Sequence, residues 1–152
     1  MHINKITVFT YDANYSNGTY NMSGGRNATA TGQRSLVVWI NIDDDIEGWV
    51  ESAPLGGDYL PSFFNGELAA LKELSTHVLG LDLRSPAVVG AAMHGILMSG
   101  AAAKAIIDIA CWDIPGKAVG LPTSVLLVGR QQKELLAISV IGIGNRRSEG
   151  SR

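Results

Sequence analysis

The sequence predicts an α+β domain in which a three-stranded antiparallel meander is followed by a bundle of helices. Two patterns carry this prediction. Runs of β-branched residues and of alternating apolar and polar residues occupy the first third of the chain, and apolar residues at helical spacing dominate the part that follows. Strands grouped before helices, instead of alternating with them, are typical of α+β domains.

The composition is typical of a soluble globular protein and argues against several classes of partner. Of the 152 residues, 46% are hydrophobic and 17% are charged, and the formal net charge is -2. So small a charge provides no basic surface for nucleic acid, and no apolar run approaches the roughly 18 residues of a membrane span. The N-terminus has no apolar secretory core, and Cys111 is the single cysteine. We therefore expect a cytoplasmic protein without nucleic-acid or membrane partners.

The first elements are expected to be three strands of one meander. Residues 3–11 alternate apolar and polar side chains, and residues 35–43 contain the run LVVWINI. Three aspartates form the next turn, and residues 48–52 return beside the second strand. Residues 12–32 are rich in Asn, Ser, Thr and Gly, which predicts a long loop. Loops of this length are often functional, so this one is a first place to look for a site.

Helices are expected after a second loop at residues 53–62. The first should cover residues 66–79, with Asn65 as its N-cap, and the second should begin at Pro86. The third begins at residue 101 in a run of alanines. Pro115 is expected to end it near residue 113, because proline lacks a backbone donor and clashes with the preceding turn.

The third helix also carries the most specific string in the chain. AKAIIDIACWDIPGKAVGLPTSVLLVG resembles the AKxAxDxAxWDxxGKxxGxPxxxLLGG signature of the mandelate racemase/muconate lactonizing enzyme family, part of the enolase superfamily. IDDDIEGWVES is similar to the family's TDDGIxGWGE hairpin. The chain departs from these patterns at Pro115 and at three family glycines, replaced by Asp45, Val50 and Val128. We expect these replacements to be costly where the family backbone needs a positive φ.

The resemblance covers roughly residues 1–144 and implies a truncated member of the family. It implies an enolase-like N-terminal capping domain at residues 1–130, followed at 131–144 by the first strand of a missing (β/α) barrel. A whole barrel takes about 250 residues and does not fit in this chain. The apolar run LLAISVIGI at residues 135–143 matches that orphan strand, and residues 145–152 are expected to be a disordered tail.

For function, the resemblance implies a chain that is non-catalytic alone. In the family, the base and three carboxylate ligands of Mg2+ lie on later barrel strands, so we expect no catalytic residue, no metal ligand and no cofactor here. The full-length parent would abstract a proton alpha to the carboxylate of a small substrate with Mg2+, as a dehydratase or a racemase/epimerase. Whether the chain takes part in catalysis together with a barrel supplied by a separate chain is left open.

Two loops are the candidate substrate-contacting parts. YNMSGGR and APLGGDYLPSF resemble the branch of cis-3-hydroxyproline dehydratases and hydroxyproline-betaine epimerases. Family loops that shape substrate choice match residues 15–26 and 54–59, and the candidates on them are Tyr20, Met22, Arg26 and Tyr59. A tyrosine face could attract a cationic ring nitrogen, worth about 0.5–2 kcal/mol. The alternative interpretation is that both tyrosines merely anchor their loops.

Two other functions stay open. The chain could be a stand-alone interaction or ligand-binding module that uses the same two loops, or a separate chain could supply the barrel. An apolar strand at residues 135–143 would have two unpaired edges, so we expect a homo-oligomer or an aggregate through it.

The charged residues of the third helix are expected to be structural. Asp108 and Asp113 should pair with Lys104 and Lys117 or cap neighbouring turns instead of acting in catalysis. Cys111 lies in the same apolar helix and is expected to be an inert core thiol.

Overall fold

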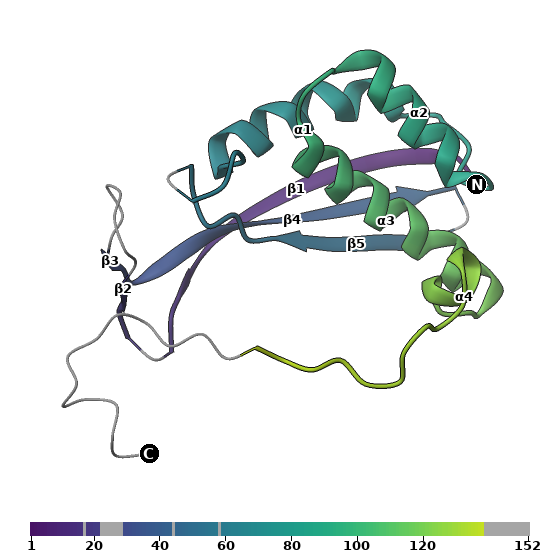
Figure 1. The fold of residues 1–152 in the computed structure, drawn as a ribbon. Coiled ribbons are helices and arrows are strands. Elements are labelled where there is room, and N and C mark those ends of the chain that lie inside the picture. Colours follow the sequence, from purple (N-terminus) through teal and green to yellow (C-terminus); the bar gives the residue numbers. More distant parts are fainter. Residues whose placement is uncertain (17, 22–28, 44, 58, 139–152) are drawn as a thin grey trace.

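The computed structural model describes residues 1–16, 18–21, 29–43, 45–57 and 59–138, and it confirms the predicted α+β class. A three-stranded sheet is covered on one face by helices (Figure 1). The elements in chain order are β1 (Ile3–Asn14), β2 (Tyr20–Asn21), β3 (Thr29–Ala30), β4 (Gly32–Ile42), β5 (Glu47–Ser52), α1 (Phe64–Val78), α2 (Pro86–Ile96), α3 (Ala101–Val119) and α4 (Thr123–Leu127).

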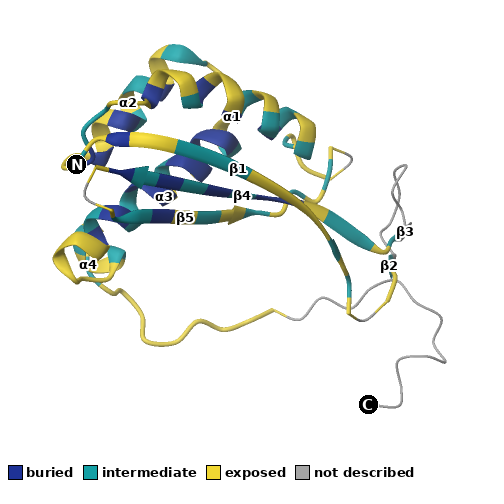
Figure 2. Cartoon of the chain, turned by 180° about the vertical axis from the view of Figure 1, so that it is seen from behind, coloured by how far each residue is buried: buried dark blue, intermediate teal, exposed yellow. Residues whose placement is uncertain are grey.

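The sheet has the strand order β1-β4-β5, and both pairings are antiparallel, as a meander requires. Alternate residues of β4 are buried, which places Leu36, Val38 and Ile40 against the helices and Val37 and Trp39 on the opposite face. Both views of the chain show the helices on one side of the strands (Figure 2). The described residues place no helix over the other face, which we call the outer face.

Much of the predicted loop at residues 12–32 is in fact β-structure. β1 continues to Asn14 and β4 begins at Gly32, because these two residues are paired, and β2 pairs with β3 beyond them. A Cβ atom at residue 32 would stand closer than 3.0 Å to the carbonyl oxygen of Ala13, so glycine is required at this end of the β1–β4 pair. The sequence prediction missed this extension because its residues are polar and lack alternation.

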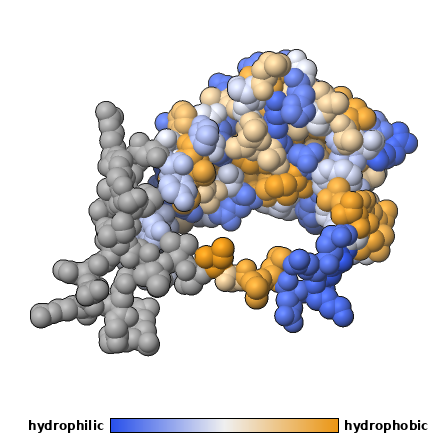
Figure 3. All heavy atoms as spheres, viewed as in Figure 1, coloured by the Kyte–Doolittle hydropathy of each residue, from blue (hydrophilic) through white to orange (hydrophobic). Residues whose placement is uncertain are grey.

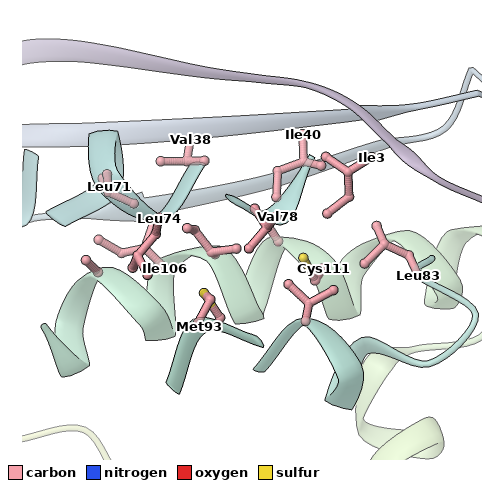
Figure 4. Close-up of a cluster of buried hydrophobic side chains, with 14 of the residues drawn as sticks. Ile3, Val38, Ile40, Leu71, Leu74, Val78, Leu83, Met93, Ile106 and Cys111 are labelled. Atoms are coloured by element: carbon pink, nitrogen blue, oxygen red, sulfur yellow. The ribbon is translucent and has the colours of Figure 1, made fainter. Parts of the chain in front are cut away.

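The core lies between the sheet and helices α1, α2 and α3. Figure 4 shows its side chains pointing toward one another from all of these elements. The fully buried ones include Ile3, Val38, Ile40, Leu71, Leu74, Val78, Leu83, Met93, Ile107 and Ile114. Burial of about 1.5–3 kcal/mol for each such side chain is the main stabilising term of the domain.

The prediction that Pro115 ends the third helix is wrong, since α3 continues to Val119. The proline removes one backbone hydrogen bond, but the following turn is held from outside the helix. Lys117 donates to the carbonyl oxygen of Glu47 at 2.7 Å and to Asp113 at 2.6 Å. The helix ends instead at Gly120, which has a φ of 67° and donates to the last carbonyls. Tertiary contacts thus outweigh the local cost of the proline.

The other helices deviate from prediction by a few residues. α1 begins at Phe64, so Asn65 lies inside its first turn and is not the N-cap, a position that Phe63 occupies. α2 begins with Pro86 in its first turn, as predicted.

The described part of the predicted orphan strand forms no secondary structure. Leu135, Leu136 and Ile138 are 88%, 96% and 89% exposed. The segment after α4 stands apart from the body of the domain, with apolar atoms in contact with solvent (Figure 3). The remainder of the predicted strand and the tail at 145–152 lie outside the described residues, so the strand and the division into domains stay predictions.

Candidate functional site

The two candidate loops lie side by side and enclose a groove of about 1030 Å³ at one end of the sheet. One wall comes from the end of β1 and the start of β4, and the other comes from the loop between β5 and α1. Its lining residues include Asp12, Tyr15, Tyr20, Gln33, Arg34, Pro54, Leu55, Tyr59 and Phe64. Residues that are far apart in the sequence therefore meet at one surface.

Backbone hydrogen bonds hold the first loop in place. The amide of Tyr15 donates to the carbonyl of Thr31 at 2.9 Å, which extends the hairpin by one bond beyond β1. The amide of Gly18 donates to the carbonyl of Tyr15 at 3.2 Å and closes a turn. Tyr20 is then set opposite Ala30 in the β2–β3 pair, where its side chain lines the groove.

A tight turn presents the second loop. The amides of Tyr59 and Leu60 both donate to the carbonyl of Gly56, at 3.1 and 3.0 Å. Gly56 has a φ of 106°, a conformation that favours glycine. This turn holds the Tyr59 side chain outward, 65% exposed at the groove.

An Asp–Arg pair lines the groove. The Nε of Arg34 donates to Asp12 Oδ1 at 3.0 Å, and its guanidinium lies 4.4 Å from the centroid of the Phe64 ring. Nearby, the hydroxyl of Tyr15 donates to Gln33 Oε1 at 3.3 Å. Arg34 thus connects β1, β4 and α1. The sequence analysis did not select it, although a continuous hairpin register would have placed it opposite Asp12.

Two of the four predicted site residues come together in this groove. Tyr20 is half-buried and Tyr59 is exposed, and both line it. Met22 and Arg26 lie outside the described residues, so their part in the site stays a prediction.

The predicted structural role of Asp113 agrees with the structure. Its Oδ2 accepts from the Lys117 amino group and from the backbone amide of Trp49, at 2.6 and 3.2 Å. Asp113 therefore joins α3 to β5, the strand at the edge of the sheet.

The expected pair of Lys104 and Asp108 is not formed. The Lys104 amino group is buried, donates to the carbonyl oxygen of Leu97 and lies 3.2 Å from His94 Nδ1. It is directed to the end of α2, where the helix dipole and free carbonyls attract a cation. Burial raises the pKa of Asp108 above its ordinary value.

One of the three replaced glycines occupies a left-handed backbone position. Asp45 has a φ of 57°, and it is the only non-glycine residue with positive φ in the described part of the chain. Val50 and Val128 have negative φ angles, so the expected backbone cost does not arise from φ at these two positions. Aspartate tolerates the left-handed region better than most residues.

Within the described ranges, no three His, Cys, Asp or Glu side chains gather in a way that could hold a metal ion. No helix in the described part is both long and apolar enough to span a membrane.

Comparison with known proteins agrees with this architecture. Residues 5–128 match the family described as mandelate racemase / muconate lactonizing enzyme, N-terminal domain. A cis-3-hydroxy-L-proline dehydratase from Roseibium aggregatum is 38% identical over 135 residues, which make up 89% of this chain and 36% of that protein. This relative fits the narrower resemblance of the two loops to the hydroxyproline branch.

Solved structures give the same result. A mandelate racemase/muconate lactonizing enzyme from Roseovarius nubinhibens ISM, complexed with magnesium, has a TM-score of 0.86 and 34% identity, and the match covers 95% of this chain and 38% of that one. A dipeptide epimerase from Enterococcus faecalis V583, complexed with Mg and the dipeptide L-Leu-L-Tyr, has a TM-score of 0.72 at 26% identity over 84% of this chain and 34% of that one. The chain thus spans about a third of the length of these relatives. It belongs to the mandelate racemase/muconate lactonizing enzyme family of the enolase superfamily and corresponds to its N-terminal domain.

Proposed function

We propose that this chain is the capping part of a magnesium-dependent dehydratase or epimerase that acts on a small carboxylate, and that it is non-catalytic alone. The convergence of the two loops in one groove carries this proposal. The names of the relatives support the reaction class, since one is a dehydratase of a hydroxyproline and another is an epimerase. In such enzymes the metal stabilises the negative charge that develops when the proton leaves.

The role of this chain is to bind and orient one side of the substrate. A proline derivative carries a carboxylate and a cationic ring nitrogen, and the ring faces of Tyr20 and Tyr59 would attract the cation. The Arg34 guanidinium is paired with Asp12 and lies over the Phe64 ring, so it adds a hydrogen-bond donor at the groove. Closing such a surface over a barrel would exclude water from the reaction.

Titration of the full chain with cis-3-hydroxy-L-proline tests the binding role. We expect amide shifts in nuclear magnetic resonance spectra that concentrate around Tyr20 and Tyr59. Tyr59→Leu should weaken the interaction severalfold, because it removes the aromatic face, and the matched variant Tyr59→Phe should retain it. Equal effects of the two variants would contradict the role of the ring.

Activity of the chain alone tests the other half of the proposal. With Mg2+ and the same amino acid, we expect no dehydrated product. Co-production with the part of the Roseibium relative that follows its own N-terminal domain should restore turnover if this chain acts as a cap. Turnover by the isolated chain would contradict the proposal.

A stand-alone ligand-binding module is the second candidate. It is favoured by one observation: residues of this chain form both walls of a groove of about 1030 Å³. Saturable binding of a ligand without any effect of a barrel chain would support it. Reading the source DNA beyond the last codon in all three frames separates the two candidates, because a barrel sequence there would make the chain the front part of an enzyme.

A further inference from the structure

The outer face of the sheet carries a cluster of large aromatic side chains in contact with solvent. Phe9 on β1 and Trp49 on β5 are 47% and 45% exposed, and Trp39 on β4 lies between these strands. Figure 2 shows these strands free of helices on this side. Contiguous apolar surface of this kind is typical of a site of interaction.

The aromatic rings are packed against one another. The centroids of Phe9 and Trp49 are 6.4 Å apart with nearly parallel planes, and those of Trp39 and Trp49 are 6.0 Å apart. The amino group of Lys5 lies 5.4 Å from the centroid of the Trp39 ring. The cluster is therefore held in a defined shape without a partner, which lowers the entropy lost on binding.

Charges at the two edges of this face are opposite and lie in one row. The strand register places Lys5 of β1 across Asn41 from Glu47 of β5. The next row contains Thr7, Trp39 and Trp49. The face thus has a cation at one edge, an anion at the other, and aromatic rings beside them.

We propose that the outer face binds the outer face of a second copy of this chain, in a two-fold dimer with the two sheets packed face to face. If the two-fold axis runs parallel to β4, β1 of each copy lies over β5 of the other. Lys5 then faces Glu47 of the second copy at both edges, and the aromatic rows stack between them. Nearly aligned strands are a common arrangement for packed sheets.

The size of the face predicts a weak dimer. Three strands about 4.8 Å apart, with three outward rows about 6.8 Å apart, give a flat area of roughly 300 Å². Even with the larger accessible area of the side chains, the interface lies at the low end of known sizes, below about 1,200 Å² in total. We therefore expect weak association, which sedimentation detects as a concentration-dependent monomer–dimer equilibrium.

Reversing the charges at residues 5 and 47 of the full chain tests the proposed dimer, with sedimentation equilibrium as the measurement. Lys5→Glu and Glu47→Lys alone should each raise the dissociation constant roughly tenfold, because two like-charged pairs replace two attractive ones. The double variant, which carries both substitutions, should have a dissociation constant within about twofold of the wild-type value. Trp49→Glu should abolish association whatever the charges at the edges.

Two further variants keep the test decisive. Val88→Glu, on the exposed side of α2, is the matched surface control and should leave association unchanged. Leu136→Asp reports on association through the apolar segment after α4. Loss of association in Leu136→Asp, failure of the double exchange to restore it, or a wild-type chain that stays monomeric up to millimolar concentration would overturn the proposal. The thermal melt of each variant verifies that it folds, and none of these outcomes depends on the groove.

Discussion

Gly48 of β5 lies directly against the carbonyl oxygen of Ala110 in α3. A Cβ atom at residue 48 would stand closer than 3.0 Å to that oxygen and 3.0 Å from the Ile114 side chain. Strand and helix can approach this closely because residue 48 has no side chain. The contact places α3, with its family signature, on the edge strand of the sheet.

This contact predicts that Gly48→Ala is strongly destabilising. The backbone of α3 would have to move, and overpacking of this kind costs about 1–3 kcal/mol of unfolding free energy. Gly95→Ala is the matched control, because a Cβ atom there meets nothing within 4 Å inside helix α2. Gly95→Ala should raise the free energy of unfolding by about 0.5–1 kcal/mol. Urea denaturation of both variants measures the difference, and equal stabilities would show that α3 can shift freely.

Cys111 should be protected from thiol reagents in the folded chain. Its side chain is fully buried, and burial, together with the charge of Asp108, raises its pKa to about 12. At pH 8 we expect labelling roughly a thousandfold slower than in denaturant, because the thiolate is the reactive form. A spectrophotometric thiol assay with and without urea measures the ratio. Fast labelling without urea would mean that α3 opens readily.

Part of the acid sensitivity of the domain should come from Asp43. Its carboxylate accepts from the His2 backbone amide at 2.8 Å and contacts the His2 ring at 3.2 Å. These bonds lower its pKa from the ordinary 3.8 to about 2. The ionised form is therefore favoured by folding, and its contribution is complete above about pH 4 and is lost as the pH falls to about 2.

Melting temperatures measured between pH 5 and pH 2 test this expectation. Asp43→Asn should show a shallower loss of stability over this range than the wild type. His2→Ala is the control, since it retains the backbone donor, which is the larger cause of the shift, and should keep most of the pH dependence. The same slope in Asp43→Asn and the wild type would assign the acid sensitivity to other groups.

The sequence pattern was sufficient to predict the strands and helices in which one face is consistently apolar. Leu36, Val38 and Ile40 alternate along β4, and Leu71, Leu74 and Val78 repeat along α1, so burial on one side can be read directly. The three strands also lie in the sheet in chain order, as sequential strands usually do.

The pattern failed where distant residues decide the local structure. Residues 12–14, which lack an apolar alternation, remain in a strand because β4 pairs with them. Pro115 remains in a helix because Lys117 and Gly120 hold the next turn. In the groove, Tyr20 and Tyr59 were selected through the resemblance, whereas Arg34 follows only from the extended register opposite Asp12. Local propensity does not contain these long-range contacts.

Deletion of residues 134–152 should improve solubility without unfolding the domain. Leu135, Leu136 and Ile138 are almost fully exposed, whereas the buried core residues lie between Ile3 and Ile114. Removal of an exposed apolar segment lowers aggregation, and the unfolding free energy should change by less than about 0.5 kcal/mol. Light scattering and a thermal melt of the shortened chain measure both effects, with Leu136→Asp in the full chain as a matched test of the apolar surface alone. A cooperative melt that is lost on deletion would place the segment in the core of this domain, and the assignment to a barrel strand would then be wrong.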